Sequence, residues 1–188
     1  MNKKPVLHLM VNNKCDNDCP LCCNKQYDVK EVPVVTEEDL LSIDEICFTG
    51  GQPLRNFEAF MSLFNGIRYY ENIKYAYIYA NGSEFLPWKF EHIEKLQNIL
   101  LDTQIKTNLT LSPKNDKDWE GLNAMKWCLN TYSMRHTSNF LYCFTDEDLV
   151  KAKDMMHYMN IIPVKREWQP EFKPAPNTFF RRLPIWLE

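Results

Sequence analysis

Hydrophobic and polar positions follow two patterns that alternate along the chain. Short apolar runs, rich in β-branched and aromatic residues, predict strands at 5–11, 45–49, 74–80, 105–111, 139–144 and 161–164. Between them, apolar residues recur at helical spacing, which predicts helices after Thr36 and over 56–70, 87–96, 116–132 and 145–159. Six strands and five helices in alternation indicate an α/β fold with parallel strands and right-handed connections.

Local signals mark where several helices begin. Thr36 and Asp39 have the spacing of a capping box, and Thr145 with Asp148 repeats it before the last predicted helix. Pro87 suits the first turn of the helix after the third strand.

A chain of 188 residues fits one domain but is short for an eight-unit barrel. We therefore expect a single α/β core over residues 1–164. Residues 165–188 contain four prolines and several aromatic residues, so we expect an extended tail that packs on this core. An alternative use of this tail is a substrate or partner surface around Arg181 and Arg182.

Cysteine content, hydropathy and net charge indicate the cellular environment and the kinds of partner to expect. Seven irregularly spaced cysteines do not indicate a disulfide framework and favour a reducing, cytoplasmic location. No segment has the pattern of a signal peptide or a membrane span. A formal net charge of −3 argues against general nucleic-acid binding.

The first predicted strand is followed by Cys15, Cys19 and Cys22 at C-x3-C-x2-C spacing. Three thiolates on one short loop can hold three irons of a cubane cluster and leave the fourth iron open to another ligand. Structural zinc needs four ligands and no second cysteine pair follows, although a zinc site or a purely structural cluster stays an alternative. Cys23 directly follows the triad and is treated as a loop residue.

The second predicted strand ends in Gly50-Gly51-Gln52-Pro53, where the glycines allow a ligand to approach the backbone. The two motifs together resemble the radical S-adenosylmethionine (SAM) superfamily. That resemblance implies a partial TIM-like (β/α)6 barrel over residues 1–164, open on one side, with a [4Fe-4S] cluster on Cys15, Cys19 and Cys22 and SAM as the second cofactor. The same resemblance implies homolytic SAM cleavage to a 5′-deoxyadenosyl radical that abstracts a substrate hydrogen. It also implies a flavodoxin- or ferredoxin-type reductant.

Further positions are assigned to SAM by the resemblance and by their place after predicted strands, where parallel α/β arrays form their sites. Gly50 and Gly51 would offer backbone groups to the methionine moiety, and Gln52 holds the place of a Glu that usually meets its ammonium. Asn81 and Ser112 are equally explained as turn residues. The whole candidate set for SAM is Leu21, Cys23, Thr49, Gly50, Gly51, Gln52, Asn81, Ser112 and Lys114.

Two positions depart from the family pattern. Gln52 replaces the usual Glu, and a neutral hydrogen bond is about half as strong as a charge-assisted one. Leu21 replaces an aromatic residue that commonly lies near the adenine. Both changes affect SAM affinity and leave the cluster ligands intact.

The sequence is compatible with two classes of substrate, a small molecule or a peptide or protein. Ser112-Pro113-Lys114 resembles a segment of 7-carboxy-7-deazaguanine synthases, which makes deazapurine synthesis an alternative function. Cys23-Asn24 does not match the magnesium-site residues of those enzymes. A noncatalytic iron–sulfur or zinc protein with the same fold is the third alternative.

Overall fold

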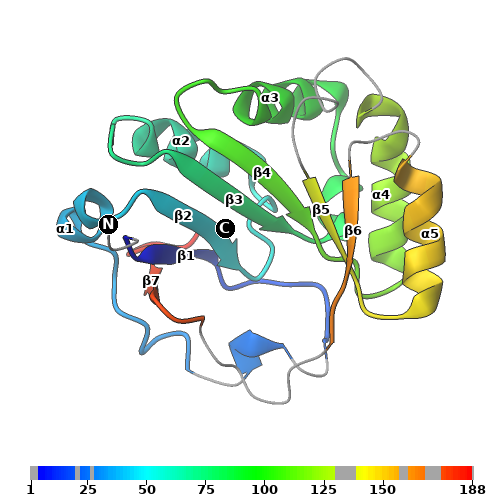
Figure 1. Cartoon of the computed structure of the whole chain (residues 1–188), viewed down its shortest axis with the longest axis horizontal. Helices are drawn as coiled ribbons and strands as arrows, with labels where there is room; N and C mark the ends of the chain where they lie inside the picture. Colours follow the sequence, from blue (N-terminus) through cyan, green and yellow to red (C-terminus); the bar gives the residue numbers. More distant parts are fainter. Residues whose placement is uncertain are drawn as a thin grey trace. The chain divides into compact units, whose positions relative to one another are not determined.

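The computed structural model describes residues 4–19, 22–25, 28–129, 139–156, 161–167 and 175–187. Within them, seven parallel strands alternate with helices, and the sheet is not closed into a barrel (Figure 1). The α/β fold class with parallel strands is confirmed, and the open sheet is consistent with a partial barrel. No helix in these ranges is long and apolar enough to cross a membrane.

The chain forms two compact units, Met1–Ile78 with Gln169–Glu188 and Tyr79–Trp168. The boundary falls inside one strand, β3 (Tyr75–Ala80). Each unit is described by itself.

The first unit contains β1 (Val6–Asn12), β2 (Glu45–Gly50), the start of β3 and β7 (Thr178–Arg182), paired in the order β7-β1-β2-β3. Its helices are α1 (Glu37–Ser42) and α2 (Phe57–Ile67). The predicted capping box before α1 is confirmed, because Thr36 accepts from the Asp39 N–H and Asp39 accepts from the Thr36 N–H.

The core of this unit lies between the sheet and α2. Phe48 of β2 is fully buried, and its ring packs 5.2 Å from Phe60 and 6.0 Å from Phe64, measured between centroids. Leu9 and Ile78 are the register partners of Phe48 on the adjacent strands and are buried with it. The apolar residues of these strands stabilise the unit mainly because folding removes their side chains from water.

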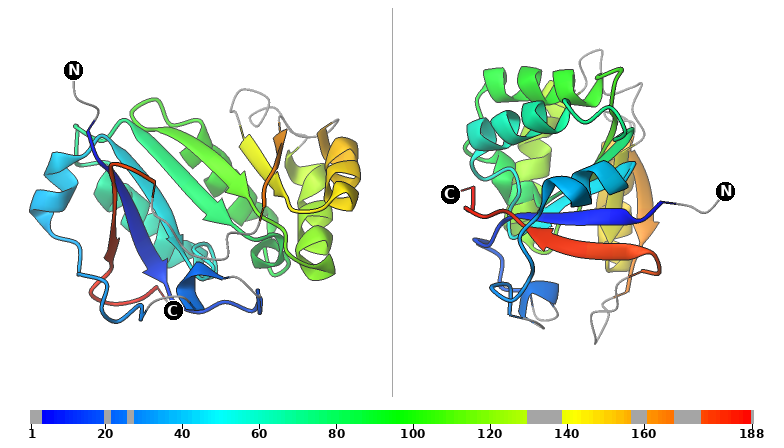
Figure 2. Two further views of the ribbon diagram at one scale, coloured as in Figure 1. Left: turned by 60° about the horizontal axis from the view of Figure 1, so that its bottom comes forward. Right: turned by 90° about the vertical axis from the view of Figure 1, so that its left-hand side faces the viewer.

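The C-terminal tail contains a strand that the sequence pattern did not predict. β7 pairs in parallel with β1: Val6 lies opposite Thr178 at one end of the pairing, and Met10 lies opposite Arg182 at the other. The two strands lie side by side in Figure 2. Arg181 makes a bidentate ion pair with Asp39 of α1, at 2.8 and 3.0 Å. In the described part of the tail, Arg181 therefore links β7 to α1.

The second unit contains the end of β3, β4 (Lys106–Leu111), β5 (Asn139–Cys143) and β6 (Ile161–Lys165), all in parallel. Its helices are α3 (Phe90–Leu100), α4 (Asp116–Leu129) and α5 (Asp146–Met156). The second capping box is confirmed, with Thr145 and Asp148 exchanging hydrogen bonds of 3.0 Å. The prediction that the third helix starts at Pro87 is wrong, because α3 begins at Phe90. A short 3-10 helix, η2 (Gly82–Phe85), comes before it.

Two glycines of the second unit allow η2 to lie directly against α4. A Cβ atom at Gly82 would overlap the Asp118 carbonyl group, and a Cβ atom at Gly121 would overlap the Gly82 carbonyl group. Gly66 of α2 differs, since a Cβ atom there would meet nothing within 4 Å. Glycine is thus required by packing at Gly82 and Gly121, and not at Gly66.

Replacing these glycines by alanine should change stability in opposite directions. We expect Gly82→Ala and Gly121→Ala each to lower the free energy of unfolding by roughly 1–3 kcal/mol, because backbone segments must move apart. Gly66→Ala should raise it by about 0.5–1 kcal/mol, because alanine costs less entropy in a helix. Urea denaturation of the three variants measures these differences, and a destabilised Gly66→Ala protein would contradict the packing described here.

His8 of β1 is largely buried and lies 4.7 Å from the Phe180 ring of β7, between centroids. Burial disfavours the charged imidazolium and lowers the pKa of His8 to about 4. The folded protein therefore keeps this side chain neutral over a pH range in which the unfolded chain takes up a proton.

The stabilising contribution of neutral His8 should be fully present above pH 6.5 and be lost as the pH falls toward 4. The reason is that the unfolded state binds the proton first, so each step down in pH favours unfolding. The measurement is the free energy of unfolding between pH 7.5 and 4 for wild type and His8→Phe. The difference between the two proteins should depend on pH in that window, and a difference that is constant would show that His8 titrates normally.

Candidate functional site

The cysteine loop follows β1 in the first unit. Cys15 is exposed, Cys19 and Cys22 are half-buried, and none of the three forms a disulfide bond. The Cys22 N–H donates to the Cys19 carbonyl at 3.4 Å, and the short helix η1 (Cys23–Lys25) follows. Leu21 and the Cys23 side chain lie outside the described residues.

The turn after β2 lies against the backbone of this loop. Gly50 has a φ of 118°, and a Cβ atom on Gly50 or Gly51 would overlap the carbonyl oxygen of Asn12 or Lys14, respectively. The Gly51 N–H donates to the Asn12 carbonyl at 2.6 Å and the Gln52 N–H to the Lys14 carbonyl at 2.9 Å. The two sequence motifs are therefore brought together, and the glycines are required for this contact.

These hydrogen bonds change the role expected of the glycine turn. The expectation was that its amides would be offered to a ligand, but the Gly51 and Gln52 N–H groups donate within the chain. Thr49 lies one residue before the turn and is the register partner of Met10 on β1.

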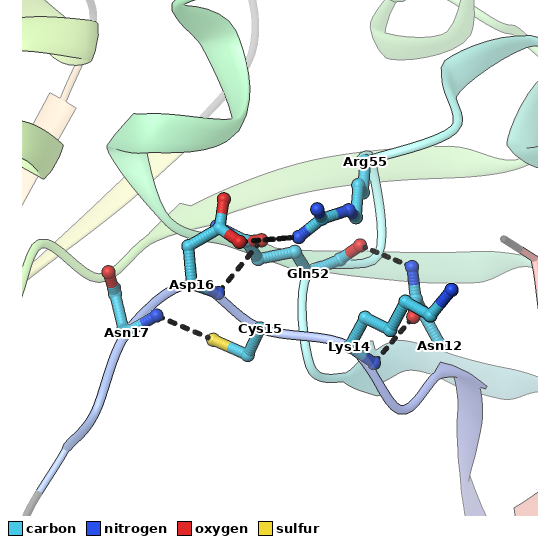
Figure 3. Close-up of polar contacts among 7 residues, drawn as sticks. All are labelled: Asn12, Lys14, Cys15, Asp16, Asn17, Gln52 and Arg55. Atoms are coloured by element: carbon cyan, nitrogen blue, oxygen red, sulfur yellow. Dashed lines mark hydrogen bonds and ion pairs between the residues drawn. The ribbon is translucent and has the colours of Figure 1, made fainter.

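Gln52 is 1 % exposed and joins the turn to the cysteine loop. Its side-chain Oε1 accepts from the Asp16 N–H at 3.2 Å and from the Arg55 guanidinium at 3.1 Å, as Figure 3 shows. Its carbonyl oxygen accepts from the Asn12 side chain at 3.2 Å. The oxygen that family resemblance assigns to the methionine ammonium is thus engaged twice inside the protein.

Charged groups surround the cysteine loop. Arg55 is paired with Asp16 at 2.7 Å, with both side chains nearly half exposed. Lys25 contacts Asp18; hydrogen bonding to Asp18 raises the pKa of Lys25, and the nearby Cys22 and Cys19 add to this effect. The Asn17 N–H points to the Cys15 sulfur at 3.4 Å, a contact that favours the thiolate.

The remaining candidates lie in the second unit. Asn81 caps η2, and its N–H donates to the buried Glu84 carboxylate at 2.6 Å. Ser112 follows β4, and its N–H donates to the Ala80 carbonyl at 2.9 Å. The Lys114 ammonium contacts the Ser112 hydroxyl and lies 3.9 Å from the centroid of the Phe144 ring. Asn81 therefore has a clear structural role, as the turn interpretation expected.

Asp118 is a residue that the sequence analysis did not single out. It is fully buried, and its carboxylate accepts from the Ser83 N–H at 3.0 Å and the Lys114 N–H at 2.8 Å. The segments after β3 and β4 are thereby held to α4. A cavity of about 250 Å³ beside Lys114 is lined in part by Trp119 and Phe144. No sequence signal separates Asp118 from the other carboxylates at the start of α4, because only burial distinguishes it.

The donor set of the loop fits an iron–sulfur cluster in its chemistry. Thiolates are the preferred protein ligands of such clusters, and the loop carries three cysteines that form no disulfide bond. In the described part of the chain, no three His, Cys, Asp or Glu side chains are already gathered closely enough to hold a metal ion. Cluster binding would therefore draw the three thiolates together.

No protein-family model matches the sequence, and no curated protein matches it either.

Removal of the Asp118 carboxylate should destabilise the second unit strongly. Asp118→Ala removes the acceptor of the buried Ser83 N–H and of the partly buried Lys114 N–H, so we expect a loss of roughly 2–3 kcal/mol in the free energy of unfolding. Asp116→Ala is the matched control, since Asp116 is in the same helical turn but exposed, and its loss should cost less than about 0.5 kcal/mol. Equal effects of the two substitutions in urea denaturation would refute this role.

Proposed function

We propose that this chain is a radical SAM enzyme that binds a [4Fe-4S] cluster through Cys15, Cys19 and Cys22. The observation that supports it is the junction of the two motifs. The cysteine loop after β1 and the Gly50-Gly51-Gln52 turn after β2 lie in direct backbone contact at the carboxyl ends of adjacent parallel strands. Ligand sites of parallel α/β folds form at this end of the strands.

When bound, the cluster would pass one electron from a flavodoxin- or ferredoxin-type reductant to SAM, which yields methionine and a 5′-deoxyadenosyl radical able to abstract a substrate hydrogen. The chain itself holds the cluster and orients the loop. Cys15, Cys19 and Cys22 would supply thiolates, and the Asn17 N–H would stabilise negative charge on the Cys15 sulfur. The glycine turn fixes the distance between the loop and β2.

A noncatalytic iron–sulfur protein is the second candidate, and one observation favours it. The Gln52 amide oxygen accepts two hydrogen bonds within the protein, which leaves less capacity for the methionine ammonium. Both functions predict a cluster on the same three cysteines, and they differ in SAM cleavage.

Anaerobic reconstitution with iron and sulfide should give about four irons per chain in wild type. Addition of dithionite and SAM should then release 5′-deoxyadenosine, and both results should be lost in Cys19→Ala. Cys47→Ala is the matched control: Cys47 is buried in β2, and burial raises the pKa of its thiol to about 12, so it stays protonated and is a poor ligand.

The outcomes separate the candidates. A cluster without 5′-deoxyadenosine supports the noncatalytic protein, and release of 5′-deoxyadenosine excludes it. Copurified zinc in place of iron would overturn both. If SAM is cleaved, a substrate screen that includes 6-carboxytetrahydropterin with magnesium tests the deazapurine alternative.

A further inference from the structure

The three cysteines of the loop are held in different ways. Cys19 and Cys22 are joined directly by the backbone hydrogen bond between them. Cys15 lies on the irregular segment that follows β1, and the two residues beside it are held by Gln52, which belongs to the turn after β2. The Gln52 N–H donates to the Lys14 carbonyl at 2.9 Å, and the Gln52 Oε1 accepts from the Asp16 N–H at 3.2 Å.

We call these two hydrogen bonds the Gln52 bridge. One is made by the backbone and one by the side chain, so the peptide groups before and after Cys15 are both tied to a single residue. Figure 3 shows the side-chain hydrogen bond, from the Asp16 N–H to Gln52 Oε1. Gln52 is 1 % exposed, and a buried polar side chain is costly unless it is hydrogen-bonded. The bridge therefore accounts for the burial of an amide at this position.

Arg55 strengthens the same arrangement. Its guanidinium donates to Gln52 Oε1 at 3.1 Å and to the Asp16 carboxylate at 2.7 Å, so it contacts both partners of the side-chain hydrogen bond. A cation beside the amide oxygen polarises it and favours the rotamer that faces Asp16.

We propose that Gln52, supported by Arg55, is a positioning residue that sets the place of Cys15 as a cluster ligand. The acceptor oxygen of Gln52 acts on the cysteine loop and not on the ligand of the open iron. This inference rests on the proposed function for its consequence in cluster binding, whereas the bridge itself is testable in cluster-free protein.

The first test measures the bridge without any cluster. Gln52→Met keeps the size of the side chain but removes the acceptor, so the Asp16 amide hydrogen should exchange with solvent about five- to tenfold faster, as expected for the loss of one hydrogen bond. Gln52→Glu keeps an acceptor that can serve both Asp16 and Arg55, so exchange should stay close to wild type. Hydrogen exchange followed by NMR gives the value for this single amide.

The second test measures cluster loading. We expect Gln52→Met and Arg55→Met to take up less iron than wild type under the same anaerobic reconstitution, and Gln52→Glu to take up the same amount. Gln104→Met and Arg68→Met are the matched controls, since both residues are exposed and take no part in the Gln52 bridge. Urea denaturation of all variants checks that they are folded, and Arg55→Met, which removes an exposed side chain, keeps the test valid if Gln52→Met does not fold.

The two tests together decide whether Gln52 positions Cys15. Unchanged exchange and iron content in Gln52→Met, together with weaker SAM binding, would overturn the positioning role and assign Gln52 to the ligand. Faster exchange with reduced iron content, restored by Gln52→Glu, supports it. If wild type itself takes up no cluster, the proposed function fails, while the exchange measurement still decides whether the Gln52 bridge exists.

Discussion

The backbone contact between the turn after β2 and the loop after β1 is the constraint on which the candidate site depends. Gly51 donates to Asn12 and Gln52 donates to Lys14, at distances that a side chain on either glycine would prevent. The nearest members of the two motifs, Cys22 and Gly50, are 28 positions apart in the sequence, and α1 lies between them. These hydrogen bonds join the two motifs into one structural element. The parallel pairing of β1 with β2 brings both turns to the same edge.

A similar logic governs the second unit. Gly82 and Gly121 let η2 approach α4 at backbone distance, and the buried Asp118 carboxylate joins the segments that follow β3 and β4. In both units, residues that resemble ligand-binding groups by type are engaged in holding loops at the ends of strands. Such rigid loops are what a cofactor site requires, because positioning groups act best when their own rotamers are locked.

Gln52 shows why residue type alone is an ambiguous guide to function. As a replacement for Glu in a cofactor motif, it indicates a weakened contact to a ligand. In the structure, its oxygen has two donors within the protein, one from the cysteine loop and one from Arg55. A neutral amide suits this place, since one oxygen satisfies both donors without adding a second carboxylate beside Asp16.

The sequence by itself determined the alternation of strands and helices, both capping boxes and the positions of the two motifs, because these depend on periodicity and on contacts within a few residues. Tertiary structure alone decided three features: the pairing of β7 with β1, the burial of Asp118, and the Gln52 bridge. β7 is a short strand that ends in two arginines, and its place depends on its pairing with β1 and on Arg181 reaching Asp39, more than 140 residues away. Contacts between residues distant in sequence leave no periodic pattern, which is why only the fold could reveal them.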